Sequence, residues 1–354
     1  MPELPEVEHA RRLLERTCEN QRCVRVILPS HFSKEKDDKL FKSCSEESFV
    51  EYCLNRKLSK VERRGKQMWL SFEDERFVLV HFGMTGALSV LGERALKFVE
   101  FKVDEENWPP KFYKFVLEFE NGKKVAYTDP RRFGRVQLRD QHPSLSMPVM
   151  KLGFDPYLDV VTIETFVKAF KKRNKAIKSA LLDQSVCAGI GNWMADEILY
   201  QSGIHPEMKA SELNDVELGK LRNAMFDVTK KAVDSDADAN RFPDDWLFHH
   251  RWGKDSNARM KNGQKIHFLE VGGRTTAFVP TIQKKTSSSS ASTLNKLPAN
   301  KRQKKATASV VVEKSNKKKK TTTTTTTTTT TISAPQAAAR ATRRAIKSAF
   351  FLVR

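Results

Sequence analysis

The sequence lacks the cysteine pattern of a metal finger or a disulfide framework. Its 354 residues include five cysteines, an odd number, and no two of them form a CxxC pair. Scattered cysteines of this kind are typical of a reducing compartment and do not make a cysteine zinc site. We therefore expect no metal and no other cofactor.

Long apolar runs are also missing. No run approaches the ~18 residues that a membrane-spanning helix requires, and the N-terminus lacks the apolar core of a signal peptide. The sequence predicts a soluble, intracellular protein without a membrane partner.

Acidic residues are nearly absent from the C-terminal end. The chain has 63 Lys and Arg against 43 Asp and Glu, a net charge of +20. Residues from Lys284 onward contain 17 Lys and Arg and only one acid, Glu313, so this tail carries +16 of that charge. A mildly basic body with a strongly basic tail indicates a local nucleic-acid groove and a tail attracted to phosphate without sequence preference.

The tail also has a low-complexity composition. It contains the basic clusters 301–305 and 317–320 and eleven consecutive threonines, 321–331. Such a segment cannot bury enough apolar surface to fold, so residues 284–354 are predicted to be disordered. The clusters fit nuclear import or loose DNA affinity, and a plain solvated linker is the alternative.

Short runs with strand character fill the first part of the chain. Phe115, Leu117 and Phe119 alternate with polar residues, and Asn121-Gly122 then favours a hairpin turn. The spacing of these runs predicts an antiparallel sandwich or barrel over residues 2 to about 145. The predicted strands are 22–28, 67–72, 77–82, 87–91, 115–119, 124–128 and 135–138.

Helical periods replace the strand pattern after Pro148. The sequence predicts helices near 163–170, 177–183 and 215–233, and between the last two lies VCAGIGNWMADEILYQSGIHP. Gly189 and Gly191 permit a tight turn, and Asn192 can cap the helix that follows. Such a turn is a natural phosphate site, although ordinary helix packing produces the same pattern.

The N-terminal octapeptide MPELPEVE places reactive groups at the chain terminus. Removal of Met1 would leave the secondary amine of Pro2, and a terminal amine with a pKa near ~7.7–8.0 is partly neutral at physiological pH. Such a nitrogen can attack a sugar carbon and form an iminium, with Glu3 as general acid or base. Pro5 favours the start of a helix that runs to about Glu19.

A hairpin with a Gly-Gly turn is predicted near the end of the folded part. Residues 265–271 and 274–280 alternate on either side of Gly272-Gly273, and Arg274 follows the turn.

The strings MPELPEVE and GIGN…GIHP closely resemble those of the formamidopyrimidine-DNA glycosylases, which repair oxidised bases. The resemblance implies that Pro2 attacks the deoxyribose, that Glu3 assists, and that the lysine of RRGKQMWL, Lys66, lies beside the phosphate and base of the lesion. We expected Lys66 at the start of a strand. Asn192 matches a contact to the DNA backbone.

Three further residues match those that, in the family, fill the gap left by an extruded base. Rotating a base out of the duplex costs a few kcal/mol, and apolar wedges unstack base steps. HFGMTG supplies Met84, and TDPRRFG supplies Arg131 and Phe133. Arg132 is expected to support a phosphate.

Two remaining residues complete the DNA-binding set. Arg274 resembles the phosphate-binding arginine of the family's zincless finger. Glu6, in the N-terminal octapeptide, is the other residue expected to bind DNA. No cysteine follows Cys187, so the contact is expected without the metal.

The resemblance implies an α+β fold: an N-terminal antiparallel β-sandwich with an N-terminal helix, then a helix-two-turns-helix domain with a zincless-finger β-hairpin. We place the catalytic domain at 1–147, the helical domain at 148–247, the hairpin at 248–283 and the tail at 284–354. The protein is expected to be a monomer that binds damaged double-stranded DNA in the nucleus.

The implied activity is that of a bifunctional DNA glycosylase and abasic-site lyase on oxidised purines, especially formamidopyrimidines. The segment DSDADANRFP, 234–243, is shorter than the loop that covers 8-oxoguanine in bacterial relatives, so efficient excision of that base is not expected. One alternative is the endonuclease VIII branch, which prefers oxidised pyrimidines and resembles PEGPE, where this chain has Leu4. The other is a catalytically silent binder of damaged DNA or RNA.

Overall fold

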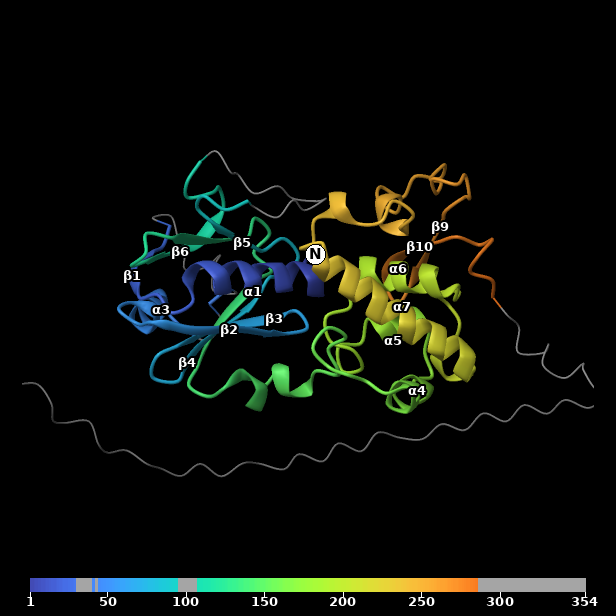
Figure 1. The fold of residues 1–354 in the computed structure, drawn as a ribbon, viewed down its shortest axis with the longest axis horizontal. Coiled ribbons are helices and arrows are strands. Elements are labelled where there is room, and N and C mark those ends of the chain that lie inside the picture. The colour runs from blue at the N-terminus through green and yellow to red at the C-terminus, as the bar shows by residue number, and fades with distance from the viewer. Residues whose placement is uncertain (30–39, 42–43, 95–106, 286–354) are drawn as a thin grey trace, which may run out of the picture. The chain divides into compact units, whose positions relative to one another are not determined.

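Two antiparallel sheets in the N-terminal half pack around one core (Figure 1). The computed structural model describes residues 1–29, 40–41, 44–94 and 107–285. One sheet has the strand order β1-β6-β7-β5 and the other β2-β3-β4-β8. The strands are β1 (Cys23–Ile27), β2 (Leu58–Arg64), β3 (Gln67–Phe72), β4 (Arg76–His81), β5 (Ala87–Val90), β6 (Tyr113–Phe119), β7 (Lys124–Thr128) and β8 (Arg135–Arg139).

The alternation that predicted the strands also builds the core. Phe115, Leu117 and Phe119 of β6 are buried in the same apolar cluster as Met68, from the other sheet. Because successive side chains point to opposite faces of a strand, one face of each sheet can fill this core. The sequence prediction of a mixed α and β fold is confirmed.

Two connections cross from one sheet to the other and lie against each other. The first, residues 82–86, joins β4 to β5, and the second, residues 129–134, joins β7 to β8. Gly83 of the first connection packs on the backbone of Phe133 in the second, where a Cβ atom would lie 2.3 Å from the Phe133 carbonyl carbon. This contact requires glycine, and its φ of +62° favours glycine as well.

Helix α1 (Leu4–Cys18) begins where Pro5, in the first turn, lacks an N–H that would have no helical partner. The stripe predicted for it is buried: Val7, Ala10, Leu14 and Cys18. The helix ends one residue before the predicted end.

The second half of the described chain is mostly helical. Phe166 and Phe170 are fully buried in its core, and burial of each stabilises the fold by about 1.5–3 kcal/mol. Gly203 follows α6 with a φ of +70°, the left-handed conformation in which glycine commonly ends a helix. The helices are α3 (Glu46–Cys53), from the first half, α4 (Ile163–Lys171), α5 (Ile177–Leu181), α6 (Asn192–Ser202) and α7 (Asp215–Asp234). Single 3-10 turns are η1 (Pro143–Leu145), η2 (Val149–Lys151), η3 (Ala210–Glu212), η4 (Ala239–Arg241) and η5 (Leu247–His249).

A two-stranded hairpin follows the helices, as predicted. Its strands β9 (His267–Val271) and β10 (Arg274–Phe278) pair with Val271 opposite Arg274, so Gly272 and Gly273 form the turn. Both glycines have positive φ, which suits a tight hairpin.

A buried arginine ties α1 and β2 to the segment that leads into the helical half. The Arg63 guanidinium donates to Glu8 at 2.7 Å and to the carboxylate of Asp155. The three side chains are between 0% and 3% exposed. Asp155 also accepts the backbone N–H of Gly65 at 2.8 Å, so the turn after β2 is fixed by the same carboxylate.

The sequence analysis missed α3 and β2. Strand β2 reads LSKVERR, so most of its residues are polar. One of its buried side chains is the charged Arg63, which points inward to two carboxylates, and the sequence therefore shows no alternation of apolar and polar residues. Helix α3 has eight residues, too few for a clear helical period.

The prediction of a disordered tail falls on residues 286–354, outside the described part of the chain. Within the described ranges no helix combines the length and the apolar composition that a bilayer crossing demands.

We predict that Arg63→Ala lowers the free energy of unfolding by about 3–5 kcal/mol, because Glu8 and Asp155 would lose a buried cation. Urea denaturation at neutral pH measures the change. Arg25→Ala is the matched control, since Arg25 is exposed and lies 3.9 Å from Glu118. Its removal should cost less than about 1 kcal/mol. Equal losses in the two variants would contradict this account.

Candidate active site

The Glu3 carboxylate caps helix α6, although the two are far apart in the sequence. It accepts backbone N–H bonds from Gly191 at 2.7 Å, Trp193 at 2.9 Å and Met194 at 3.2 Å. Glu3 is only 2% exposed. A carboxylate at a helix N-terminus satisfies unpaired N–H groups and is stabilised by the helix dipole.

Glycines make this approach possible. A Cβ atom on Gly191 would lie 2.2 Å from the carboxyl carbon of Glu3, so any other residue would displace the carboxylate. Gly189 has a φ of +97°, and a Cβ there would lie 2.7 Å from that of Leu4. The backbone of residues 189–191 is therefore the surface against which the N-terminal residues pack.

Lys66 lies in the turn between β2 and β3, directly before the predicted strand 67–72, which the structure contains as β3. Gly65 precedes it with a φ of +57° and packs against Ala188 and Gly189. This packing brings the turn to the same loop that holds Glu3. Burial lowers the pKa of Lys66, while the charges of Glu3 and Glu6 act to raise it.

The pKa of Glu3 is raised by burial, against the opposing effect of the Lys66 charge. An ammonium group with a lowered pKa beside a carboxyl group with a raised one suits proton transfer near neutral pH.

Glu6 is a second carboxylate of this cluster. It accepts the backbone N–H of Glu3 at 2.9 Å and the indole N–H of Trp193 at 3.0 Å. Burial, followed by the charge of Glu3, raises the pKa of Glu6 to about 7. Both protonation states are thus populated at neutral pH.

Pro2 is buried in the structure, in which Met1 precedes it and is half-buried. Its position is set by Glu3, whose carboxylate is fixed on α6. The peptide bond between them keeps the Pro2 ring next to the cluster of Glu3, Glu6 and Lys66.

Asn192 does not cap α6, contrary to the sequence prediction. Gly191 is the N-cap residue, Glu3 supplies the capping oxygens, and Asn192 is the first helical residue. The Asn192 side chain donates to the carbonyl of Thr275 at 3.0 Å, in the hairpin. Its carbonyl oxygen is buried without a partner in the described part of the chain.

Arg274 is exposed at the start of β10, directly after the glycine turn. Its charge contributes to lowering the pKa of Lys66, after the effect of burial. The two cations therefore interact electrostatically, although 208 positions in the sequence separate them.

A buried ion network holds this hairpin on the helices. Asp196 of α6 accepts bonds from Lys178 at 2.6 Å and from Arg251 at 2.8 Å. It also accepts the backbone N–H of Ala277 in β10 at 3.1 Å. Lys178 in turn donates to the Thr276 hydroxyl at 2.7 Å. These contacts fix the strand that carries Arg274.

No cysteine lies in the hairpin, and the described residues contain no group of three or more His, Cys, Asp or Glu side chains arranged to hold a metal ion.

Met84 and the 131–133 segment lie in the two crossover connections of the sheets. The buried Asp129 joins them: its carboxylate accepts the Thr85 hydroxyl at 2.8 Å and the Gly134 backbone N–H at 2.7 Å. Met84, next to Thr85, is half-buried in a turn between strands, as predicted.

Phe133 projects from this platform with 53% of its surface exposed. The Arg131 guanidinium lies over the Phe133 ring, 5.1 Å from its centre. Arg132 has a φ of +56°, which turns the backbone between these two residues. An exposed aromatic side chain on a braced loop is a suitable wedge.

Sequence reasoning missed Asp129, Asp196 and His81. Asp129 belongs to the motif TDPRRFG. An aspartate before a proline often accepts hydrogen bonds from nearby backbone groups, so the sequence did contain a signal for its structural role. His81 ends β4, two residues before Gly83, whose backbone N–H donates to its Nδ1 atom at 3.1 Å. Nothing in the local sequence indicated that Asp196 has two cationic partners.

Solved structures of DNA glycosylases share this fold. The Lactococcus lactis formamidopyrimidine-DNA glycosylase, bound non-covalently to DNA with an abasic site, gives a TM-score of 0.64 at 23% identity, covering 80% of this chain and 100% of that one. MutM in complex with carbocyclic 8-oxo-G-containing DNA gives 0.64 at 24%, with the same coverage. The chain thus has the glycosylase fold with a helix-two-turns-helix element.

Sequence comparisons identify the family. Family models match the formamidopyrimidine-DNA glycosylase N-terminal domain at 1–136, its H2TH domain at 152–244 and the related C-terminal domain at 246–280. The Arabidopsis thaliana formamidopyrimidine-DNA glycosylase is 38% identical over 302 residues, which are 85% of this chain and 75% of that protein. The Ligilactobacillus salivarius enzyme is 33% identical over 80% of this chain and 99% of its own. The chain belongs to the formamidopyrimidine-DNA glycosylase family.

We predict that Gly191→Ala displaces the Glu3 carboxylate and lowers both stability and any activity at this site. The added methyl group has no room at 2.2 Å from the Glu3 carboxyl carbon. Thermal unfolding and single-turnover assays measure the two effects.

The control is Gly219→Ala in α7, where a Cβ atom meets nothing within 4 Å. That variant should be more stable by up to about 1 kcal/mol, because alanine favours a helix over glycine. A neutral effect of Gly191→Ala on both measurements would be inconsistent with the capping contact.

Proposed function

We propose that this protein is a bifunctional DNA glycosylase and abasic-site lyase that excises oxidised purines, especially formamidopyrimidines, from damaged double-stranded DNA. The observation that carries the proposal is the placement of residue 3 on the N-terminus of α6, beside Lys66. The family relatives are named formamidopyrimidine-DNA glycosylases, and a related enzyme has been solved in complex with DNA that contains an abasic site. Both observations support the same activity.

In this mechanism the nitrogen of Pro2, freed by removal of Met1, attacks C1′ of the damaged nucleotide. The bond from C1′ to the base breaks, and the base leaves with the electron pair and takes up a proton. Glu3, with its raised pKa, protonates the sugar ring oxygen as the ring opens, which yields an iminium between Pro2 and C1′.

The iminium makes the protons on C2′ acidic, so a base can remove one and the 3′ phosphate leaves by β-elimination. A second elimination then releases the 5′ phosphate, and addition of water to the iminium breaks the bond between C1′ and the Pro2 nitrogen and frees the enzyme. Glu3 would also carry these protons, because burial raises its pKa. Glu6 remains a proposed member of the DNA-binding set.

Lys66 and Arg274 contribute positive charge where phosphate oxygens of the lesion strand would lie. Asn192 contributes its side-chain amide, which lies beside the hairpin and donates to the Thr275 carbonyl. Counterion release on neutralising phosphates would make binding strongly dependent on salt.

Met84, Arg131 and Phe133 would occupy the gap left by the extruded base. Phe133 is exposed and Asp129 braces its loop, so the wedge is preorganised. Arg131 provides hydrogen-bond donors for the orphaned base, and Arg132 remains a proposed phosphate contact.

The preference for formamidopyrimidines rests on the segment after α7. This connection is short, and Phe242 within it is buried against Trp193 and Trp246. A short segment packed into an aromatic cluster supports weaker excision of 8-oxoguanine, because bacterial relatives cover that base with a longer loop.

Three further properties are proposed on the sequence alone. The protein acts as a monomer and uses no metal, and its basic tail directs it to the nucleus or increases its DNA affinity. The domain boundaries given above also remain predictions.

The proposal is tested with duplexes that each contain one lesion: a formamidopyrimidine, 8-oxoguanine or an oxidised pyrimidine. We predict fastest single-turnover excision of the formamidopyrimidine and strand products of β,δ-elimination. Glu3→Gln should slow excision by at least about 100-fold, because it removes a general acid.

Glu15→Gln is the matched control, since Glu15 is exposed on the same helix and pairs with Arg11. It should retain the wild-type rate. Preferred excision of the pyrimidine lesion would favour the endonuclease VIII alternative, and binding without excision of any lesion would favour the silent binder.

A further inference from the structure

Trp193, the second residue of α6, contacts both carboxylates at the N-terminal end of the chain. Its backbone N–H donates to Glu3 at 2.9 Å, and its indole N–H donates to Glu6 at 3.0 Å. Any residue except proline could supply the backbone donor, whereas the second donor belongs to the tryptophan side chain. The indole contact is therefore a specific feature of this position.

An aromatic cluster fixes the indole ring. Trp193 is only 4% exposed, and its ring centre lies 5.0 Å from that of Phe248, which meets it edge-on. The rings of Phe242 and Trp246 lie 5.7 Å and 6.5 Å away. All three partners belong to the segment between α7 and the hairpin. Because the ring cannot turn without displacing this packing, its N–H stays directed at Glu6.

Two donors set the orientation of the Glu6 carboxylate. Its Oε1 atom accepts the indole N–H, and its Oε2 atom accepts the backbone N–H of Glu3 at 2.9 Å. A carboxylate has about four lone-pair sites, so each oxygen can still accept one further proton or hydrogen bond. Glu6 is half-buried. Its orientation is thus fixed while part of its accepting capacity remains open.

The N-terminal nitrogen is a candidate for the next donor. Pro2 directly precedes Glu3, so only the Cα and carbonyl carbons of Pro2 separate its nitrogen from the N–H that binds Glu6. Met1 bears the terminal ammonium in the structure, and removal of Met1 would transfer it to Pro2.

The charges around Glu6 favour proton exchange with such an amine. Burial and the Glu3 charge raise the pKa of Glu6 to about 7, while the terminal ammonium acts to lower it. Lys66, in the turn after β2, also interacts electrostatically with Glu6. A terminal amine ordinarily has a pKa near ~7.7–8.0, so transfer between the two groups costs little free energy.

We propose that Trp193 is a positioning residue, whose indole holds Glu6 in the orientation that accepts the proton of the Pro2 ammonium before attack. In this step an N–H bond of the ammonium breaks and an O–H bond forms on Glu6. The ammonium and the carboxylate become a neutral amine and a carboxylic acid. The inference rests on the proposed function, in which Pro2 is the nucleophile, and adds the groups that prepare it.

The test is single-turnover cleavage of a duplex with one abasic site, between about pH 5 and pH 9, since this substrate requires attack by Pro2 but no release of a base. The wild-type rate should fall at low pH as Glu6 becomes protonated. Trp193→Phe removes a donor that stabilises the carboxylate, so the pKa of Glu6 rises and this fall should move to higher pH by about 1 unit. Cleavage should be about ten-fold slower near pH 6 and nearly unchanged near pH 9.

A second variant preserves the packing, because Trp193→Phe also leaves space in the aromatic cluster. Benzothienylalanine at position 193 replaces the indole N–H by sulfur and keeps the size of the ring. It should show the same displacement along the pH axis. A rate that falls by one factor at every pH in both variants would overturn the positioning role, since lost packing does not move a titration.

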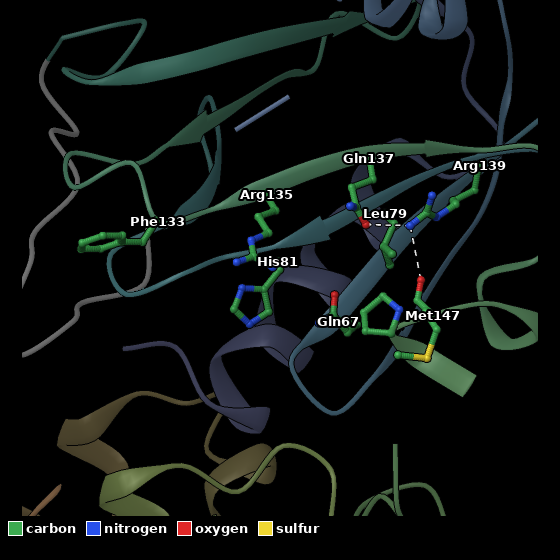
Figure 2. A pocket seen from close by; sticks show the side chains of 9 residues that line it. Gln67, Leu79, His81, Phe133, Arg135, Gln137, Arg139 and Met147 are labelled. Atoms are coloured by element: carbon green, nitrogen blue, oxygen red, sulfur yellow. Dashed lines mark hydrogen bonds between the residues drawn. The ribbon is translucent and has the colours of Figure 1, made fainter. Parts of the chain in front are cut away.

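Trp69→Phe is the matched control. Trp69 is also 4% exposed, and its indole N–H donates to a glutamate, Glu62, at 3.2 Å. It lies opposite Leu79 of β4, in an apolar cluster on the outer face of the sheet β2-β3-β4-β8. Figure 2 shows this face, where Leu79 and Gln67 line a groove of about 420 Å³. Trp69→Phe should keep the wild-type pH profile.

Glu6→Gln tests whether the effect of Trp193 acts through Glu6. The amide cannot take up the proton, so adding Trp193→Phe to this variant should change the rate by the same factor at every pH. A displacement along the pH axis that persists in the double variant would overturn the proposal. If the wild-type protein cleaves the duplex at no pH, the proposed function itself is refuted.

Discussion

The contact between the Glu3 carboxylate and the first N–H groups of α6 connects the beginning of the chain to its helical half. It fixes residues 2 to 4 against a loop near position 190, and the same loop receives the turn with Lys66. Asn192 of α6 donates to Thr275 of the hairpin that carries Arg274, and Asp196 secures that hairpin. Groups from the N-terminus, the turn after β2 and the hairpin are thus brought to one helix N-terminus.

The pKa values of Glu3, Glu6 and Lys66 are set by burial together with the charges of their neighbours. Burial raises the pKa of both carboxyl groups and lowers that of Lys66. The Lys66 charge opposes the shift at Glu3, the two carboxylates oppose the shift at Lys66, and the Glu3 charge adds to the shift at Glu6. Groups held in this balance exchange protons at neutral pH more readily than the same groups in water. The helix N-terminus supplies partial positive charge to Glu3 through backbone N–H groups.

The sequence was sufficient for much of the fold, because the alternation in β6 and β7 and the turns at Asn121-Gly122 and Gly272-Gly273 are local signals. It did not reveal β2, where Arg63 points inward, since its partners Glu8 and Asp155 come from distant segments. The same limit applied to the site. Motifs named Glu3 and Asn192, but local reasoning assigned the cap of α6 to Asn192, and only the three-dimensional contact shows that Glu3 makes it.

The central claim is that the nitrogen of Pro2 is the attacking group. It is tested most directly by reducing the enzyme–DNA intermediate with borohydride and mapping the modified peptide by mass spectrometry. The account predicts a sugar remnant on a peptide that begins at Pro2, without Met1. A remnant on Lys66, or an adduct-forming protein that retains Met1, would contradict it.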